Sequence, residues 1–192
     1  GANVLGYVSP SSAMNQQLFS KYNWIQTDEE IKQFSPKEVR LVNGIGSLPG
    51  STRRAEVFRA YKSLGYMFET VISDHALVSS HAILAEGVQI MSGAIVQTGV
   101  YIGSNSIINT GAILDHDCNI GSDNHIAPGV TLSGQVTSKS NVHFGTGASV
   151  IQLITINENS VIGAGAVIHH NVDKNTLCYP ARIFKKAINS YE

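Results

Sequence analysis

Residues 78–102 read VSSHAILAEGVQIMSGAIVQTGVYI, and a large apolar residue stands at every sixth place of this stretch. The spacing continues to residue 168 without an insertion, and fifteen of the sixteen positions carry a large apolar side chain. Ser138 is the exception. The series consists of Val78, Leu84, Ile90, Val96, Ile102, Ile108, Leu114, Ile120, Ile126, Leu132, Ser138, Phe144, Val150, Ile156, Ile162 and Ile168.

A second series stands four places after the first, and most of its members are small or β-branched, as Ala82, Val88 and Ala94 illustrate. A period of two describes a flat strand and a period of 3.6 a helix, so a period of six matches neither. It fits a short strand followed by a corner, with three such units closing one triangular coil of about eighteen residues. Large residues would then point inward and the small ones would fit near a corner. Glycines that follow the large residue would give the backbone freedom to turn; they are Gly103, Gly121, Gly145 and Gly163.

The predicted fold is therefore mainly β, a parallel β-helix whose coils bury one continuous core. An ordinary β-sandwich is the alternative, but its strands would not hold one register over sixteen units. The spacing alone does not fix handedness, and a right-handed crossover is the usual preference. The hexads resemble those of hexapeptide-repeat proteins, and that resemblance implies left-handed coils.

Residues 1–73 lack this period and predict a small α/β domain with parallel strands. Val4 to Val8 is a short apolar run, and Val39 to Ile45 is expected to form an apolar strand ending in glycines. Thr27 with Glu30 forms a capping-box pattern before Ile31. A helix is expected from Ser51 or Thr52 to about Ser63, ended by Gly65, with an extended run from Phe68 to Ile72. The expected domains are thus residues 1–73, the β-helix at 74–180, and a tail at 181–192 with a short helix.

Composition excludes several classes of protein. The chain has 192 residues, 14% charged residues and a net charge of -1, so a nucleic-acid partner has little electrostatic support. No segment approaches the roughly 20 apolar residues of a membrane helix, and no signal peptide is visible at the start. Cys118 and Cys178 show no metal-type spacing. A cytoplasmic protein without a membrane partner is expected.

Histidine is the usual proton carrier near neutral pH, and His116 lies between Asp115 and Asp117 two places after a core position. Its side chain should point outward or to a corner, where it could act as a general base with a carboxylate to orient it. Gly134 follows His116 by eighteen residues, so bare backbone should lie one coil beyond the imidazole and could donate to an oxyanion. A purely polar corner residue is the alternative. Cys118 occupies a small-residue position and is expected in the core.

Stacked histidines also raise the possibility of a metal site. His143 follows His125 by eighteen residues, so these two should stack on successive coils, and with His116 they could hold zinc. Their spacing does not match the histidine pair of hexapeptide-repeat carbonic anhydrases, so no metal is expected. The remaining histidines are expected at the surface: His75, His81, His169 and His170.

The run INTGAILDHDCNIG at residues 108–121, with His125 nine residues after His116, resembles the active-site segment of bacterial nucleotide-aminosugar N-acetyltransferases. These belong to the sialic-acid O-acetyltransferase group of hexapeptide-repeat enzymes, which carry a small α/β domain before the β-helix. Pro180-Ala181-Arg182 is similar to their C-terminal ending. The resemblance runs from about Val39 onward.

The resemblance implies roles for particular residues. His116 would be the general base, and Asp117 would raise its basicity. His125 would contact acetyl-CoA, the expected co-substrate, and Thr146 and Ala164 fall where such enzymes hold it by backbone. Gly46 matches a glycine that meets the sugar nucleotide, where close backbone approach is useful. The resemblance also implies a homotrimer with active sites between neighbouring β-helices.

Two departures from the family pattern affect acceptor recognition. The first strand and glycine-rich turn of such enzymes have no counterpart in this sequence, so we expect either a truncated N-terminal domain or a nucleotide that is held differently. Ser9-Pro10 stands where such enzymes tend to have an Asp pair. The expected function is acetyl-CoA-dependent N-acetylation of a nucleotide-linked amino sugar, such as a UDP-linked 4-amino sugar, in bacterial surface glycan or glycoprotein synthesis. The alternatives are O-acetylation of a sugar such as sialic acid and a non-catalytic scaffold.

Overall fold

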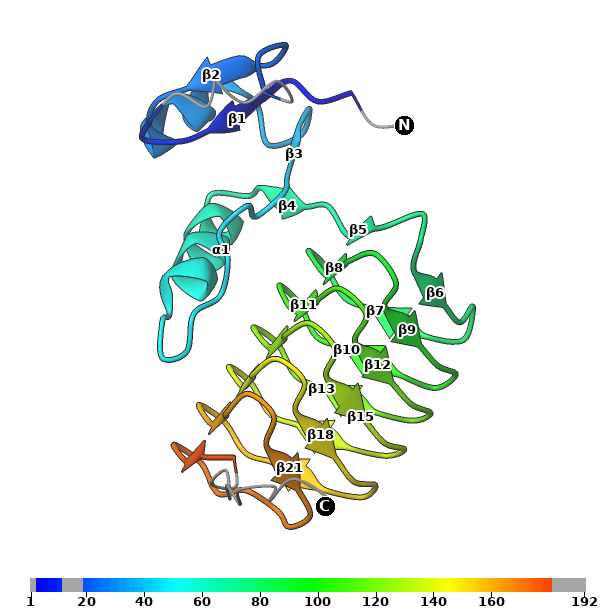
Figure 1. Ribbon diagram of the computed structural model, residues 1–192. Coiled ribbons are helices and arrows are strands. Elements are labelled where there is room, and N and C mark those ends of the chain that lie inside the picture. Colours follow the sequence, from blue (N-terminus) through cyan, green and yellow to red (C-terminus); the bar gives the residue numbers. More distant parts are fainter. Residues whose placement is uncertain (1–2, 12–18, 181–192) are drawn as a thin grey trace, which may run out of the picture. The chain divides into compact units, whose positions relative to one another are not determined.

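The computed structural model describes residues 3–11 and 19–180, so the tail helix expected at residues 181–192 lies outside the described part. The chain divides into two compact units, residues 1–40 and 41–192 (Figure 1). This packing groups residues 41–73 with the β-helix. The domain boundary predicted after residue 73 therefore stays a prediction.

The first unit contains two parallel strands, β1 (Gly6–Val8) and β2 (Asn23–Ile25), and a 3-10 helix, η1 (Asp28–Gln33). The predicted capping box does not form, because the Thr27 side chain makes no hydrogen bond to the helix backbone. Its hydroxyl instead donates to the Glu30 carboxylate at 3.1 Å. Trp24 joins the two strands, since its indole nitrogen donates to the Ser9 carbonyl oxygen at 2.8 Å.

The segment that leads into the β-helix contains one helix, α1 (Arg53–Ser63), and the short paired strands β3 (Arg40–Leu41) and β4 (Met67–Phe68). The predicted helix is confirmed, including its end at a left-handed glycine, Gly65 (φ 87°). The predicted strand from Val39 to Ile45 is wrong in length, since only Arg40 and Leu41 pair. Helix α1 packs on β4, where the ring centroids of Phe58 and Phe68 lie 4.6 Å apart. It also contacts the first coil, where Lys62 Nζ lies 2.8 Å from a Glu86 carboxylate oxygen.

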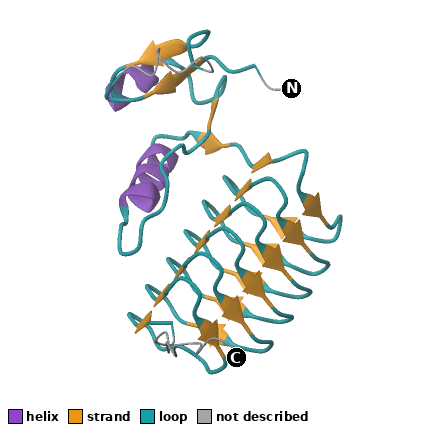
Figure 2. Ribbon diagram, viewed as in Figure 1, coloured by secondary structure: helices purple, strands orange, loops and turns teal. Residues whose placement is uncertain are grey.

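The rest of the second unit is a left-handed parallel β-helix with three sheets along its sides (Figure 2). The seven-stranded sheet consists of β5 (Val71–Ile72), β8 (Gln89–Ile90), β11 (Ile107–Ile108), β14 (His125–Ile126), β17 (His143–Phe144), β20 (Val161–Ile162) and β22 (Leu177–Cys178). The six-stranded sheet consists of β6 (Leu77–Val78), β9 (Ile95–Val96), β12 (Ile113–Leu114), β15 (Thr131–Leu132), β18 (Ser149–Val150) and β21 (Val167–Ile168). The five-stranded sheet consists of β7 (Ile83–Leu84), β10 (Tyr101–Ile102), β13 (Asn119–Ile120), β16 (Thr137–Ser138) and β19 (Thr155–Ile156).

Neighbouring strands pair eighteen residues apart, as Ile113 does with Ile95 and with Thr131, so the predicted coil length is confirmed. Three edges separate the sheets, and each is named here for one residue. The His116 edge joins the six- to the five-stranded sheet through residues 97–99, 115–117, 133–135 and 151–153. The Asn105 edge joins the five- to the seven-stranded sheet through residues 103–105, 121–123, 139–141 and 157–159. The Thr146 edge joins the seven- to the six-stranded sheet through residues 109–111, 127–129, 145–147 and 163–165.

Both predicted series point inward, and Ile90, Ile108 and Phe144 are fully buried. The exception in the large series, Ser138, is buried beside another polar residue, Asn124, from the small series. The Asn124 amide nitrogen donates to the Ser138 hydroxyl at 2.8 Å and to the Lys139 carbonyl oxygen at 2.9 Å. The break in the apolar series therefore satisfies a buried amide, as buried polar groups require.

The predicted role of the glycines directly after the large residues is wrong. Their φ angles are not positive, and a Cβ on Gly103 would lie 2.5 Å from the Gly121 carbonyl carbon of the next coil. These glycines permit close stacking of coils. The left-handed turn residue stands two places later. It is glycine at some turns, as at Gly111 (φ 66°), and Asn or Asp at most others, as at Asn105 (φ 60°), while Gln135 (φ 61°) and Leu153 (φ 64°) take it at two turns of the His116 edge. Asn and Asp tolerate this conformation better than most residues.

Within the described residues, no helix is long and apolar enough to cross a membrane.

Candidate active site

His116 and Asp117 occupy the turn of the His116 edge, directly after the inward side chain of Leu114. Asp117 is the left-handed residue of this turn, with φ 58°. The turn therefore directs two consecutive polar side chains away from the core, and their side chains are 54% and 55% exposed. The outward position predicted for His116 is confirmed.

The two side chains form a dyad, with His116 Nδ1 3.0 Å from Asp117 Oδ2. Asp115 lies on the other side, where its Oδ1 accepts the His116 backbone N–H at 2.8 Å. The pKa of His116 is raised above its usual value, chiefly by the hydrogen bond to Asp117 and further by the charges of Asp115 and Asp117, while some desolvation opposes the rise. When the Nδ1 proton lies toward Asp117, Nε2 carries the free lone pair of a base.

Glycines on both neighbouring coils leave room for the dyad. A Cβ on Gly134 would lie 2.5 Å from His116 Nε2, so the predicted bare backbone beside the imidazole is confirmed. On the preceding coil, a Cβ on Gly99 would collide with the Asp117 carboxylate. Sequence reasoning missed Gly99, although stepping back eighteen residues from Asp117 would have found it. The Gly134 N–H donates no hydrogen bond to any group in the described part of the chain.

His125 and His143 lie on the outer face of the seven-stranded sheet, where β14 and β17 pair them directly. Their rings stack with centroids 4.8 Å apart and planes 5° apart, which confirms the predicted stacking. Burial, with smaller contributions from the charges of His143 and Arg54, lowers the pKa of His125 to about 4. Burial also lowers the pKa of His143. Both rings are therefore neutral near pH 7. Neither Nδ1 has a hydrogen-bond partner among the described residues.

Thr146 and Ala164 are exposed on successive coils of the Thr146 edge, where the Gly165 N–H donates to the Thr146 carbonyl oxygen at 2.8 Å. Gly46 is exposed in the segment before α1. Its neighbour Ile45 is fixed, because the Ile45 carbonyl oxygen accepts from Arg54 Nη1 at 2.7 Å.

Apart from Gly46, the structure separates the predicted site residues into two groups on one chain. His116, Asp117 and Gly134 share the His116 edge. The second group lies around the opposite, seven-stranded sheet: His125 on its face, and Thr146 and Ala164 on the edge beyond it. Both edges flank the six-stranded sheet. The outer residues of that sheet carry no charge; they are Leu77, Ile95, Ile113, Thr131, Ser149 and Val167.

The same separation bears on the metal alternative, because His116 does not lie with His125 and His143. Within the described residues no group of three or more His, Cys, Asp or Glu side chains could hold a metal ion. Burial raises the pKa of the Cys118 thiol to about 11, and its Sγ donates to the Ser133 carbonyl oxygen at 3.2 Å, so its predicted core position is confirmed.

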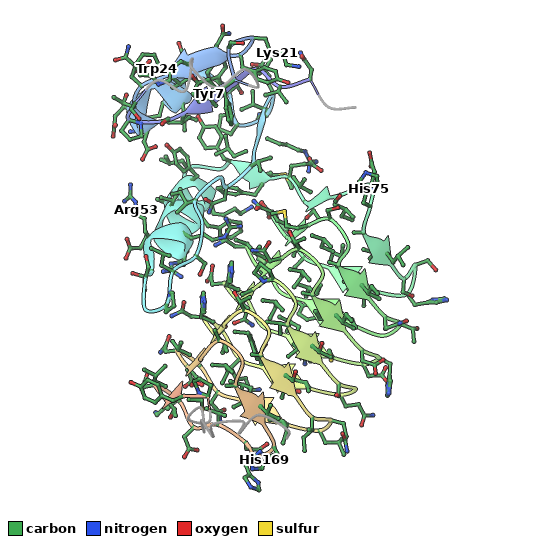
Figure 3. The ribbon with its side chains drawn as sticks, viewed as in Figure 1. Tyr7, Lys21, Trp24, Arg53, His75 and His169 are labelled. Atoms are coloured by element: carbon green, nitrogen blue, oxygen red, sulfur yellow. The ribbon has the colours of Figure 1, made fainter. Side chains whose placement is uncertain are left out.

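The side chains of His75 and His169 point away from the ribbon, as predicted (Figure 3). An open groove on the five-stranded side is lined by Asn119, Thr137 and Lys139, and it contains none of the predicted site residues.

Comparison with solved structures finds acetyltransferases with the same fold. A perosamine N-acetyltransferase variant from Caulobacter crescentus, solved with CoA and GDP-perosamine, is 29% identical with a TM-score of 0.69; the match covers 77% of this chain and 68% of that one. PerB from the same organism, also with CoA and GDP-perosamine, is 33% identical with a TM-score of 0.66, over 68% of this chain and 63% of PerB. This chain thus spans less than two thirds of PerB.

The acetyltransferase domain of PglB from Neisseria gonorrhoeae FA1090, solved with acetyl coenzyme A, is 27% identical with a TM-score of 0.75, over 96% of this chain and 84% of that one. No protein-family model and no curated protein sequence matches the chain. The eighteen-residue register and the solved relatives agree on the fold, and the relatives are acetyltransferases solved with CoA or acetyl coenzyme A. The chain is therefore an acyltransferase of the hexapeptide-repeat, left-handed β-helix type, similar to nucleotide-aminosugar N-acetyltransferases.

Proposed function

We propose that this chain transfers the acetyl group of acetyl-CoA to the amine of a nucleotide-linked amino sugar. The observation that carries the proposal is the exposed dyad of His116 and Asp117, in which a carboxylate raises the pKa of an imidazole at an accessible edge. The relatives support the choice of substrates, since C. crescentus PerB was solved with CoA and GDP-perosamine. A nucleotide-linked amino sugar is the acceptor class that they suggest for this chain.

In the proposed mechanism, the amine nitrogen of the acceptor forms a bond to the acetyl carbon, and His116 Nε2 takes a proton from that amine. Asp117 stabilises the resulting imidazolium through the hydrogen bond to Nδ1. The thioester C–S bond breaks, and the leaving thiolate accepts a proton, which the imidazolium can return. The Gly134 N–H is our candidate donor to the oxyanion on the acetyl oxygen. No covalent enzyme intermediate is needed.

We propose a homotrimer as the active form. Apart from His125 and Gly46, the predicted site residues lie on the two edges that flank the uncharged outer face of the six-stranded sheet. If that face lies toward a threefold axis, the His116 edge of one copy meets the Thr146 edge of the next, as closed cyclic symmetry requires. His116 would then act beside an acetyl-CoA held by Thr146, Ala164 and His125 of the neighbouring copy.

The identity of the sugar, of the nucleotide and of the pathway is a further part of the proposal. A UDP-linked or similar 4-amino sugar of bacterial surface glycans or glycoproteins is our first choice of acceptor. O-acetylation of a sugar hydroxyl needs the same base and remains the second candidate function. A cytoplasmic location belongs to the proposal, because acetyl-CoA and nucleotide sugars are intracellular metabolites.

A thiol-release assay tests the proposal. Wild-type protein is given acetyl-CoA with a panel of nucleotide-linked amino sugars and matched hydroxyl sugars, and His116→Ala serves as the comparison. We expect release with an amino sugar and a loss of about two to four orders of magnitude in kcat for the folded variant, the usual contribution of a general base. Release only with hydroxyl sugars would favour O-acetylation. An unchanged rate in His116→Ala would contradict the proposed base.

A further inference from the structure

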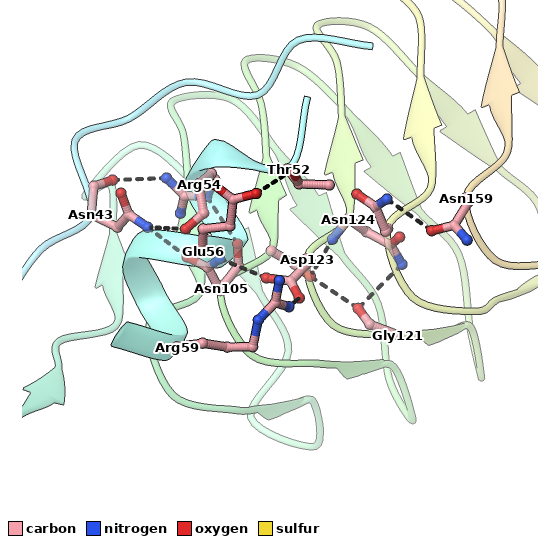
Figure 4. Close-up of polar contacts among 12 residues, drawn as sticks. Asn43, Thr52, Arg54, Glu56, Arg59, Asn105, Gly121, Asp123, Asn124 and Asn159 are labelled. Atoms are coloured by element: carbon pink, nitrogen blue, oxygen red, sulfur yellow. Dashed lines mark hydrogen bonds and ion pairs between the residues drawn. The ribbon is translucent and has the colours of Figure 1, made fainter. Parts of the chain in front are cut away.

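A buried polar network lies beneath the first turn of α1, and Arg54 is at its centre (Figure 4). The Arg54 residue is 5% exposed. Its Nε donates to the Asn105 carbonyl oxygen at 3.0 Å, and its Nη1 donates to the carbonyl oxygens of Asn43 at 2.8 Å and Ile45 at 2.7 Å. One guanidinium thus binds the segment before α1 and a corner of the β-helix together.

Asn43 closes the network from the other side. Its side-chain nitrogen donates to the Arg54 carbonyl oxygen and to Asn105 Oδ1, each at 3.0 Å, and its Oδ1 accepts the Ile45 N–H at 3.2 Å. Gln89 on β8 donates a further bond to the Asn43 carbonyl oxygen at 2.8 Å. The backbone at residues 43–45 is therefore held by side chains from α1 and from the seven-stranded sheet.

The β-helix end of the network is itself anchored. Asn105 has the left-handed conformation of its corner, and its side-chain nitrogen donates to Asp123 Oδ1 at 2.6 Å on the next coil. Asp123 also pairs with Arg59 of α1, with 3.5 Å between Nη1 and Oδ2. The Asn105 carbonyl oxygen, which accepts the hydrogen bond from Arg54 Nε, is thus part of an edge that other contacts hold in place.

Stability alone is a poor explanation for a guanidinium in this place. Burial lowers the pKa of Arg54 to about 10, although the charge of Asp123 acts to raise it. Arg54 Nη2 is buried without a hydrogen-bond partner in the described part of the chain. Apolar side chains often replace buried charges without loss of stability. What an apolar side chain could not do is donate hydrogen bonds to three carbonyl oxygens at once.

We infer that Arg54 is a positioning residue for the acceptor, an inference that rests on the proposed function. Its guanidinium fixes the Asn43–Ile45 backbone against the Asn105 edge and so determines where the adjoining Gly46 meets the nucleotide-linked sugar. Arg54 does not touch the reacting atoms in this role. It acts through the shape of the segment that ends at Gly46.

Arg54 also influences the second group of site residues. Its positive charge contributes to the lowered pKa of His125, after burial and the charge of His143. Removing the charge should therefore raise the pKa of His125. That change can be followed by ring NMR signals without any substrate.

Steady-state kinetics of Arg54→Met and Arg54→Lys test the inference. We expect the KM for the nucleotide amino sugar to rise roughly tenfold or more in Arg54→Met, as expected for lost charge-assisted hydrogen bonds. The KM for acetyl-CoA should stay within about twofold. Arg54→Lys keeps the charge and can still reach one carbonyl oxygen, so it should recover part of the acceptor affinity. The matched control is Lys62→Met, which breaks the ion pair of α1 with Glu86 and leaves residues 43–46 untouched.

Hydrogen exchange of residues 43–48 gives a readout independent of activity, and it should be faster in Arg54→Met and close to wild type in Lys62→Met. Wild-type protein that transfers to no nucleotide amino sugar would defeat the proposed function, while hydrogen exchange would still test the ordering by Arg54. Unchanged exchange and unchanged acceptor KM in folded Arg54→Met would overturn the inference. Equal effects in Lys62→Met and Arg54→Met would also overturn it, since the role would then be the docking of α1 in general.

Discussion

The imidazole of His116 has one nitrogen bound to Asp117 and the other beside the bare backbone of Gly134. Two residues only one position apart along the turn thus supply a base and its orienting carboxylate. Each needs space on a different neighbouring coil, which Gly134 and Gly99 provide. At the scale of single residues, the site depends on the eighteen-residue register as much as on the Asp-His-Asp run.

The pH dependence of kcat/KM should report the His116 dyad. A base works only when deprotonated, so activity should rise with pH through the raised pKa of His116 and level off above it. Asp117→Asn removes the largest cause of that raised pKa, so the rise should move to lower pH, and the plateau should fall because the base is weaker.

Asp115→Asn is the control for this pH measurement, because it removes the same charge but leaves the Nδ1 hydrogen bond in place. We expect it to move the rise by less than Asp117→Asn does. Equal shifts in the two variants would mean that charge alone, and not the hydrogen bond, sets the pKa of His116.

At the scale of the single coil, two kinds of glycine have different physical tasks. Gly103 lies where a Cβ would meet the backbone of the next coil, whereas Gly129 has open space around it and a left-handed φ of 69°. Gly103→Ala should lower the free energy of unfolding by about 1–3 kcal/mol, because backbone cannot move aside as a side chain can. Gly129→Ala should lose about 1 kcal/mol through strain.

Denaturant unfolding of the two glycine variants checks this difference. If Gly129→Ala were destabilised as much as Gly103→Ala, close stacking of coils would not be the reason for the glycines that follow the large residues.

The sequence predicted the coils well because their period is local. Six-residue spacing was enough to place Phe144 and Cys118 in the core and to stack His125 on His143. It could not explain Ser138, since the partner Asn124 stands fourteen residues away and belongs to the other series. Nor could it show Arg54 bound to Asn105, because that contact joins residues 51 positions apart and depends on how α1 docks.

At the scale of the whole molecule, the dyad of His116 and Asp117 lies on one edge of the β-helix, and Thr146 and Ala164 lie on another. A complete site then requires a second copy, and the uncharged outer face of the six-stranded sheet is the surface that we expect to be buried. Ile113→Asp places a charge on that face and should dissociate the trimer and abolish transfer, since burying an unpaired carboxylate is costly. Light scattering measures the mass of the assembly.

Thr137→Asp provides the control for the assembly, because it places the same charge on the outer face of the five-stranded sheet. This variant should remain trimeric and active. A wild-type chain that is monomeric and active, or an Ile113→Asp variant that stays trimeric, would contradict the proposed assembly.

The most direct test of a shared site is co-expression of two inactive variants. His116→Ala lacks the base, and Ala164→Trp should block acetyl-CoA at the Thr146 edge, so either variant alone should be inactive. If each site uses the His116 edge of one copy and the Thr146 edge of its neighbour, random mixing leaves about one quarter of the sites intact. We predict thiol release at about a quarter of the wild-type rate from the mixture. A mixture no more active than its parents would show that one chain supplies both edges of its site, and the account would be wrong.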